Sequence, residues 1–567
     1  VRRREADFDL GKIPLDDAPT YAMLGRGETV GVFQLESAGM RKALVEMHAD
    51  RFEDIIALVA LYRPGPMANI PTYCAVKLGD EDPDYLHPKL EPILKETFGV
   101  IIYQEQVMQI AQVLSGYSLG EADNLRRAMG KKIKAEMDKQ RDRFVNGAAE
   151  RGLARGKADE IFGLLAKFAD YGFNKSHAAA YALIAYQTAW FKAHYPAEFL
   201  AASMTFDKDS TDKLAEFRQE AQRLGIAVEP PSIQRSGVEF DVAPGEGGKL
   251  AIRYALSAIK GVGEGQAGSL VAARGREPFA GLGDFARRLN PREVNKKVLE
   301  TLACCGAFDE LEPDRAKVFA GVETVLASAN RRSEERAFGQ SALFDEAEAG
   351  DLALPKAAPW TAAERLQREF DAAGFFLSGH PLDAFRAVSK RLRLQRWGEF
   401  SAAVKRGASA GRLAAIVLDR YERRTKSGSK MGIFQLSDDS GQYEAILFQE
   451  GLTQYRDLLE KGAAVLLTLS GALEGEDVRA RIVAAEPLAA VAARNLKGLR
   501  VLVRDAEPVP RLREGLSARG EGEVAIIVTR DAAQDEIEIK LPGGYLVSAE
   551  VAGRLGAIPG VISVEHI

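Results

Sequence analysis

Near residue 408 the sequence changes from helical patterns to a series of short strand-like segments, and this change constrains the fold more than any other feature. The segments are apolar or alternate between apolar and polar residues, with turns rich in Gly, Ser and Asp between them. Five strands within about 80 residues are typical of a small closed β-barrel of the OB type. We predict these strands at residues 412–419, 431–437, 443–449, 463–473 and 478–485.

Helical patterns dominate the chain up to about residue 225. Ser118-Leu119-Gly120-Glu121 has the form of a capping box, and Gly130 stands where a helix over residues 119–129 would stop. A further helix is predicted from His177 to about His194, with Ser176 as its cap.

The segments after residue 225 have different predicted structures. Residues 226–256 read as irregular, residues 257–310 as short helices, and residues 328–358 as a polar linker. The last 70 or so residues alternate strand-like and helical runs, which predicts a small α/β unit.

These patterns together predict a multidomain α+β protein. Its parts are a helical N-terminal region, a helix-hairpin-helix module, an OB-type barrel and a small α/β C-terminal domain. We place the boundaries at 1–30 for a connector, 31–225, 226–327, 328–407 for a linker with short helices, 408–490 and 491–567.

Composition excludes several classes of protein. The net charge of −5 rules out a uniformly basic nucleic-acid coat, so any positive surface must be local. No run of about 18 apolar residues occurs, which excludes a transmembrane helix. Cys74, Cys304 and Cys305 form no CxxC pair, which argues against a zinc ribbon and a disulfide framework. Cysteine use this sparse suits the reducing cytoplasm, where we expect the protein.

Positive charge gathers in residues 126–143, which hold eight basic residues and three acids. Such a run indicates either a solvated helix face or a track for phosphates. The nearby Phe173-Asn174-Lys175-Ser176-His177 favours the second reading, because helix N-terminal amides and these side chains can bind an anion. Arg63, between residues rich in Pro and Gly, adds a guanidinium group.

Two further segments suggest contacts with DNA. Residues 259–265 have the helix-hairpin-helix pattern, in which Lys260, Gly261 and Gly263 would grip a duplex backbone; the alternative is a plain tight turn. In the barrel, aromatic and basic residues around the first turn fit single-strand binding, although strand aromatics are more often core. The candidates there are Tyr421, Arg423, Arg424 and Lys430.

Five motifs in order closely resemble the fingers region of the bacterial DNA polymerase III alpha subunit, a replicative polymerase of the C family. They are Gly31–Ser37, Leu61–Pro66, Ile102–Met108, Leu125–Lys132 and Tyr171–His177. The resemblance implies template-directed DNA synthesis from dNTPs, with fingers that contact the dNTP and the primer-template. Gln104 and Glu105 would organise this site. The implied contacts are Arg63, Gln104, Arg126, Arg127, Lys131, Lys132, Asn174, Lys175 and His177.

The linker contains a peptide of the form Gln-x-x-Leu-Phe, made of Gln340, Leu343 and Phe344. Two apolar anchors in a polar strand would fill a pocket on a sliding clamp, with the amide at its edge. Chance alone yields this pattern in roughly one chain in ten of this length, but its position matches the family's beta-clamp site. The resemblance also implies that the tail docks onto the clamp-loader tau subunit.

Nucleotidyl transfer requires two divalent metals held by carboxylates. The resemblance implies Mg²⁺ bound by palm aspartates that precede the fingers. The three candidate acid pairs in this chain read as structural or surface acids: Asp7 with Asp9, Asp82 with Asp84, and Asp207 with Asp209. We therefore expect no metal ligand and no catalytic residue here.

The sequence thus predicts a fragment that runs from the fingers to the C-terminus. It would lack the palm and the amino-terminal phosphoesterase-like domain, through which a proofreading exonuclease subunit would bind. Such a chain should bind DNA without polymerising alone. The alternatives are a free-standing, non-catalytic clamp- and DNA-binding adaptor, and an error-prone paralogue of the same family; the clamp peptide and the long tail argue against the paralogue.

Overall fold

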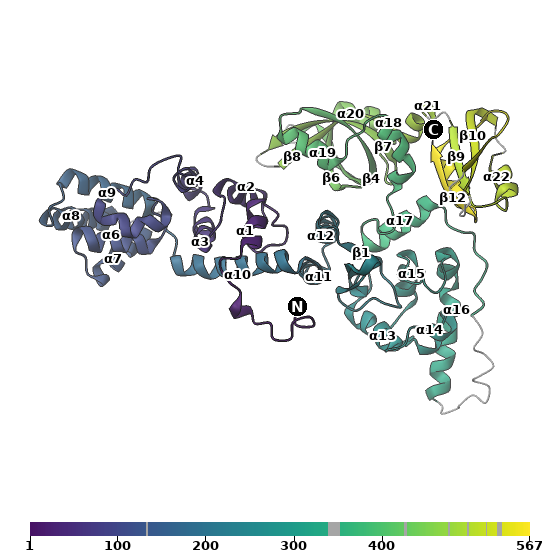
Figure 1. Cartoon of the computed structure of the whole chain (residues 1–567), viewed down its shortest axis with the longest axis horizontal. Coiled ribbons are helices and arrows are strands. Elements are labelled where there is room, and N and C mark those ends of the chain that lie inside the picture. Colours follow the sequence, from purple (N-terminus) through teal and green to yellow (C-terminus); the bar gives the residue numbers. More distant parts are fainter. Residues whose placement is uncertain are drawn as a thin grey trace. The chain divides into compact units, whose positions relative to one another are not determined.

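The computed structural model describes the chain in two compact units, Val1–Leu200 and Ala201–Ile567 (Figure 1). The described residues are 1–567 without 132–133, 170, 338–351, 425–427, 475–476, 496–497, 517–518, 530–535 and 567. No helix in these residues combines the length and the apolar character needed to cross a membrane.

The first unit contains two groups of helices, each around its own apolar core. One group comprises α1 (Ala18–Gly25), α2 (Ala38–Met47), α3 (Phe52–Leu61), α4 (Ile70–Leu78) and α10 (Lys175–His194), which bury residues such as Leu44 and Tyr186. The other comprises α6 (Gln104–Ser115), α7 (Leu119–Lys131), α8 (Lys134–Glu150) and α9 (Arg155–Ala169) around Ile110 and Phe144. The short α5 (Glu91–Leu94) lies between these groups in sequence, and α11 (Pro196–Phe206) runs past residue 200.

Two of the predicted helix boundaries in this unit are wrong. Ser118 and Glu121 form the expected capping box, but α7 continues through Gly130 to Lys131. The cap of α10 is Asn174, not Ser176, because the extended backbone of Asn174 lets its side chain accept the His177 N–H. Asn is as good an N-cap as Ser, so the residue type alone does not choose between the two.

The second unit begins with α12 (Thr211–Arg223) and the hairpin module. Residues 226–256, predicted as irregular, contain a three-stranded sheet of β1 (Ala227–Glu229), β3 (Leu250–Arg253) and β2 (Asp241–Pro244) in that order. The helices that follow are α13 (Glu264–Arg274), α14 (Leu282–Arg288), α15 (Lys296–Cys304) and α16 (Arg315–Ala337). The last helix occupies the first ten residues of the predicted linker, so that part of the linker prediction is wrong.

Short helices precede the barrel, as the sequence predicts. They are α17 (Ala362–Ala373), α18 (Arg386–Arg391) and α19 (Trp397–Lys405). Single turns of 3₁₀ helix occur at Leu10–Lys12, Pro66–Asn69, Pro88–Leu90, Lys95–Thr97, Glu246–Gly248, Leu256–Ala258, Pro381–Phe385 and Arg456–Leu458.

The predicted five-stranded barrel is confirmed. The strands β4 (Ala410–Arg424), β5 (Lys430–Asp438), β6 (Gly441–Phe448), β8 (Asp477–Pro487) and β7 (Ala464–Glu474) close in that order, with β6 and β8 parallel (Figure 1). Alternate residues such as Phe434, Leu436 and Leu467 point inward and are almost completely buried, so side chains fill the barrel. The helix α20 (Gln449–Tyr455) follows β6.

The C-terminal α/β unit is also confirmed. After α21 (Leu488–Asn495) comes a sheet in the order β11 (Glu536–Lys540), β10 (Arg519–Thr529), β9 (Gly498–Val503) and β12 (Val561–His566). The crossover from β9 to its parallel neighbour β10 contains α22 (Val509–Gly515), and α23 (Ala549–Gly556) precedes β12. One face of the sheet packs on these two helices through Val501, Ile526 and Leu555.

Candidate nucleic-acid interface

The N-terminus of α10 is held in place by two side chains rather than left open. Asn174 Oδ1 accepts the His177 N–H at 2.8 Å. Glu105, in the first turn of α6, accepts the Lys175 N–H at 3.0 Å and the Asn174 amide at 2.8 Å. A carboxylate at this position satisfies amides that lack partners in the helix and complements the helix dipole. Glu105 therefore ties the start of α6 to the start of α10.

The residues before α10 form a short bridge with the residues before α6. Gln104 N–H donates to the Phe173 carbonyl at 2.9 Å, and Phe173 N–H donates to the Ile102 carbonyl at 3.2 Å. The Gln104 side-chain amide donates to the Gly172 carbonyl at 3.1 Å. This pairing of two distant segments brings Gln104 next to Asn174.

Arg63 lies over the Phe173 ring, with its guanidinium carbon 4.3 Å from the ring centroid. Its nitrogens donate to the carbonyls of Ala60 at 3.0 Å and Tyr171 at 2.8 Å. Burial lowers the pKa of Arg63, although an arginine remains charged at neutral pH. The Tyr171 ring packs directly against the backbone of residue 65. This position must be glycine, since a Cβ there would lie 2.3 Å from the ring.

Lys175 and His177 complete the group. Lys175 Nζ pairs with Glu96 at 2.7 Å and lies 5.4 Å from the centre of the Tyr103 ring. The His177 ring is exposed and stacks on Tyr181, with 4.5 Å between ring centroids. The His177 ring also lies 5.4 Å from the Phe173 ring, while Gln104 bonds the backbone of residues 172–173 and Asn174 and Lys175 follow Phe173 in the chain. We call Arg63, Gln104, Asn174, Lys175 and His177 the Phe173 cluster.

A buried charge network supports the Glu96 side of the cluster. Asp54 is fully buried and accepts hydrogen bonds from Tyr73 at 2.9 Å, Lys77 at 2.6 Å and Arg51 at 3.1 Å. Arg51 also donates to the Glu96 carbonyl at 2.9 Å. The network fixes the backbone of Glu96, and through it the position of Lys175. Sequence patterns do not indicate it, because its members are far apart in the chain.

The other predicted contacts of this region lie on helices of the second core. Arg126 and Arg127 on α7 both pair with Asp123, at 2.7 and 2.8 Å. Within the described part of the chain, no hydrogen bond or ion pair joins them to the Phe173 cluster. Lys131 is the last residue of α7, and Lys132 lies outside the described residues.

Much of the positive charge in residues 126–143 is already matched by acids. Besides the two α7 pairs, Arg141 makes a bidentate contact with Asp159 at 2.6 Å, and Arg143 pairs with Glu121 at 3.3 Å. The net +5 of the segment is therefore a poor guide to the local field, because acids outside residues 126–143, on the same helix and on neighbouring ones, pair with its cations.

The hairpin preceding α13 uses several of its amides inside the protein. Lys260 N–H donates to the Ala372 carbonyl at 3.0 Å, and Gly263 N–H donates to Gln266 Oε1 at 2.9 Å. Gly261 has a φ of +78°, which only glycine adopts without strain. The predicted turn is present, but Lys260 and Gly263 do not offer free N–H groups to a phosphate.

On the barrel, strand register separates the four predicted residues. Tyr421 pairs with Ile433 and Arg423 with Met431, so both side chains lie on the outer face. Arg424 pairs with Lys430 at the ends of β4 and β5, where alternation turns them to the opposite side.

Two residues that the sequence prediction omits join the outer face of the barrel. Phe448 is in register with Met431, and the Arg481 guanidinium lies 4.5 Å from the centre of the Phe448 ring. The β6–β8 pairing brings Arg481 to this face, and nothing in the sequence predicts that pairing. An exposed aromatic ring with flanking arginines can stack bases of a single strand.

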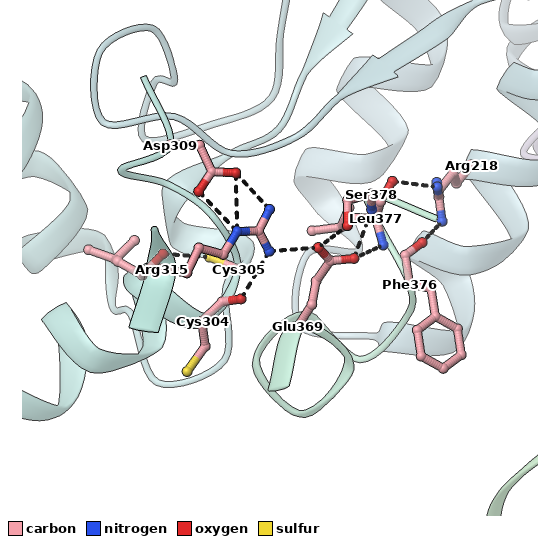
Figure 2. A network of polar contacts seen from close by, with 10 residues as sticks. Arg218, Cys304, Cys305, Asp309, Arg315, Glu369, Phe376, Leu377 and Ser378 are labelled. Carbon is pink, nitrogen blue, oxygen red and sulfur yellow. Dashed lines mark hydrogen bonds and ion pairs between the residues drawn. The ribbon is translucent and has the colours of Figure 1, made fainter. Parts of the chain in front are cut away.

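A buried ionic network holds α17 against the hairpin module (Figure 2). Arg315 makes a two-pronged contact with Asp309, at 2.9 and 2.7 Å, and donates to Glu369 at 3.0 Å. Burial lowers the pKa of Arg315, but the hydrogen bonds to these two carboxylates outweigh it and raise the pKa above its usual value. Glu369 also accepts the N–H groups of Leu377 and Ser378, the latter at 2.8 Å.

The other end of the network reaches α12. Arg218 donates to the carbonyls of Phe376 and Leu377, and the second of these bonds measures 3.1 Å (Figure 2). Burial lowers the pKa of Arg218, and the charge of Glu369 acts against this effect. The backbone of residues 376–378 is therefore hydrogen-bonded on two sides, by Arg218 and by the buried Glu369.

The structure does not test the predicted clamp contact. The clamp-binding peptide of Gln340, Leu343 and Phe344 lies outside the described residues. Among the described residues, no group of three or more His, Cys, Asp or Glu side chains could hold a metal ion. The described residues therefore do not fit a two-metal centre.

Two segments match known domain families. Residues 1–152 match the bacterial DNA polymerase III alpha subunit finger domain, and residues 225–318 match a helix-hairpin-helix motif. The first match includes Arg63, Gln104 and α7, and the second includes the hairpin before α13.

Three similar curated proteins have the same name. The chain is 46% identical over its full length to DNA polymerase III subunit alpha of Caulobacter vibrioides, and 38% identical over its full length to that of Escherichia coli K12. It is 44% identical to the Thermus aquaticus protein over 84% of its length. These alignments cover 50%, 50% and 39% of the respective relatives, so the chain spans about half the length of the curated relatives it matches. The chain belongs to the bacterial DNA polymerase III alpha subunit family.

Proposed function

We propose that this chain is the nucleotide- and DNA-binding portion of a replicative DNA polymerase, and that the Phe173 cluster contacts the incoming dNTP beside the primer-template. The observation that carries the proposal is that Arg63 and His177 both contact the Phe173 ring, while Gln104 bonds the backbone just before Asn174 and Lys175. These residues come from three separate segments, and the resemblance to the family points to each of them.

The chemistry of the cluster suits a triphosphate. Arg63 and Lys175 supply positive charge, while exposed Asn174 and His177 supply donors at the start of a helix. Glu105 and Glu96 hold these groups in place without a bound anion. A phosphate would compete with Glu96 for the Lys175 ammonium, so binding releases one internal ion pair.

Equilibrium dialysis of radiolabelled dATP against the 567-residue chain tests the proposal. His177→Ala retains the backbone N–H that donates to the Asn174 cap of α10, so it removes the ring without removing the helix start. We expect about tenfold weaker dATP binding, the effect of one lost charge-assisted hydrogen bond. Lys42→Ala, an exposed cation on α2, is the matched control and should bind as the unmodified chain does. Equal affinity of all three proteins would refute the assignment.

We further propose that the complete reaction is Mg²⁺-dependent nucleotidyl transfer, with the metal held by residues other than those described. The 567-residue chain by itself should then show no Mg²⁺-dependent primer extension. Measurable extension would contradict this part of the proposal. A non-catalytic adaptor would bind DNA equally well but would show no dNTP binding that depends on His177.

Four partner contacts remain proposals that rest on the family resemblance. Residues 340–344 would bind the sliding clamp, residues 491–567 the tau subunit, and the outer face of the barrel single-stranded template. A proofreading exonuclease subunit would bind a part of the polymerase beyond the described residues. Replication of a bacterial chromosome places all of these in the cytoplasm.

A further inference from the structure

A cavity of about 480 Å³ lies beside the hairpin, between α15, α16 and α17. The hairpin supplies the backbone at one side, and the C-terminal half of α17 supplies the other. We call this cavity the α15–α17 cleft. Residues that line it include Lys260, Gly261, Lys297, Cys304, Phe319 and Arg368.

The charge in the cleft is positive. Three of its lining residues are cations, Lys260, Lys297 and Arg368, and two are acids. Each acid already has a cation from outside the cleft: Glu300 pairs with Lys296 at 3.7 Å, and Asp371 with Lys461 at 3.3 Å. Among the described residues, no carboxylate forms an ion pair with Lys260 or Lys297. The cleft is therefore a concave site with an excess of positive charge.

Its cations are held by packing. The Arg368 guanidinium lies 4.4 Å from the centre of the Trp360 ring and 5.2 Å from that of Phe319. Lys260 is anchored by its own N–H on the Ala372 carbonyl, and its side chain runs close to Gly374, where a Cβ would be 3.2 Å from Lys260 Cε. A stacked guanidinium keeps its edge free to donate, which is the geometry that suits a phosphate.

We propose that the α15–α17 cleft binds a backbone phosphate of a DNA strand, with Lys260, Lys297 and Arg368 as its ligands. The inference rests on the proposed DNA-binding function and deepens it. Because the hairpin amides of Lys260 and Gly263 donate inside the protein, side chains must supply most of the attraction for phosphate here. The site requires α17, which lies outside the residues that match the helix-hairpin-helix motif.

Duplex binding as a function of salt is the first test. The variant Lys297→Gln with Arg368→Gln removes two charges, and Lys540→Gln with Arg554→Gln removes two exposed charges from the C-terminal domain as a control. Affinity of the 567-residue chain for a fluorescein-labelled 20-base-pair duplex is measured by anisotropy between about 50 and 200 mM KCl. The cleft variant should flatten the slope of log K against log salt by about 0.9, since the cleft holds one phosphate and each phosphate contact contributes about 0.9. An unchanged slope, equal to that of the control, would overturn the proposal.

Cys304 provides a second test that does not depend on the affinity of the variant. Its carbonyl faces Arg315, and its thiol lines the cleft, whereas Cys74 and Cys305 are buried. An anionic methanethiosulfonate reagent should modify Cys304 faster than a cationic one, as measured by peptide mass spectrometry. The ratio of the two rates should fall about fivefold in the cleft variant. A ratio near one in the unmodified chain would overturn the proposal.

Protection of Cys304 identifies the ligand. Saturating duplex DNA should slow its modification, and dATP alone should not. Protection by dATP alone would assign the cleft to a free nucleotide and overturn the proposal. The proposed function has its own readout: His177→Ala should lose dATP binding while Cys304 is modified as in the unmodified chain. If the unmodified chain had no affinity for duplex DNA, both the phosphate site and the proposed DNA binding would be refuted.

Discussion

Removal of the charge on Glu369 should loosen the contact between α17 and the hairpin module. The side chain of Glu369 is completely buried, and that of Arg315 is 6% exposed. When one member of such a pair is removed, the charge of the other stays buried without compensation, which typically costs about 3–5 kcal/mol.

The structure narrows this range for Glu369→Gln. Arg315 retains Asp309, which is 41% exposed and so can still compensate the guanidinium together with water. The glutamine carbonyl oxygen can accept either the N–H groups of Leu377 and Ser378 or the Arg315 guanidinium. In either orientation the NH₂ group, which is a donor, faces the donors on the other side. We expect a loss near the lower limit, about 3 kcal/mol. Glu369→Ala also removes both acceptors, and since Ser378 is exposed to water, the added loss should be about 1 kcal/mol.

Native-state hydrogen exchange is the suitable assay, because a single unfolding free energy is not defined for a multidomain chain. Amides in the first turns of α16 and in residues 376–378 should exchange about 150-fold faster in Glu369→Gln, since 1.4 kcal/mol corresponds to tenfold. The tail sheet provides an internal reference and should be unchanged. Asp371→Asn, an exposed acid on the same helix, should change exchange less than threefold. If both variants had the same small effect, the argument from buried charge would be refuted.

Three further predictions concern other sites. Burial lowers the pKa of His380 to about 4, so the folded state resists protonation and stability around His380 should fall as pH drops from about 6.5 toward 4; His380→Gln should remove this slope in pH-dependent thermal unfolding. Gly65→Ala should lower the local opening free energy measured by native-state hydrogen exchange by about 1–3 kcal/mol from φ strain, plus the clash with the Tyr171 ring, whereas Gly79→Ala, also at positive φ but with open space, should cost only the strain. Replacement of the Leu-Phe pair in residues 340–344 by two alanines should abolish clamp binding in a pull-down and leave duplex affinity unchanged; retained clamp binding would show that the match is coincidental.

The sequence predicted the barrel well, because its strands carry a local signal. Alternation and turn residues locate each strand, and a closed barrel follows from five short strands in one stretch. Whether a basic side chain points into the barrel or outward depends on the strand register, and the sequence alone does not reveal which strands pair. Tyr421 and Arg423 therefore share a face with Phe448, while Arg424 and Lys430 do not.

The candidate site was predictable to the extent that its residues lie in motifs. Phe173, Asn174 and His177 are consecutive or nearly so, and the helix start that joins them has a local signature. The occupancy of their donors was not predictable. The Glu105 carboxylate accepts the Lys175 N–H at the start of α10, and the Ala372 carbonyl accepts the Lys260 N–H of the hairpin. Both acceptors come from distant segments of the chain.

The role of α17 shows why such long-range contacts change the interpretation of a linker. Glu369 is buried against Arg315, and moving it out of that site would break a buried ion pair and leave Asp309 as the remaining carboxylate partner of Arg315, so α17 stays with the hairpin module. Residues 376–378, which follow it, are bound by Glu369 on one side and by Arg218 of α12 on the other. A segment held in this way cannot act as a free tether between hairpin and barrel. Two buried arginines and one glutamate therefore hold this segment against the hairpin module and α12, and the freedom expected of a linker does not extend over residues 362–378.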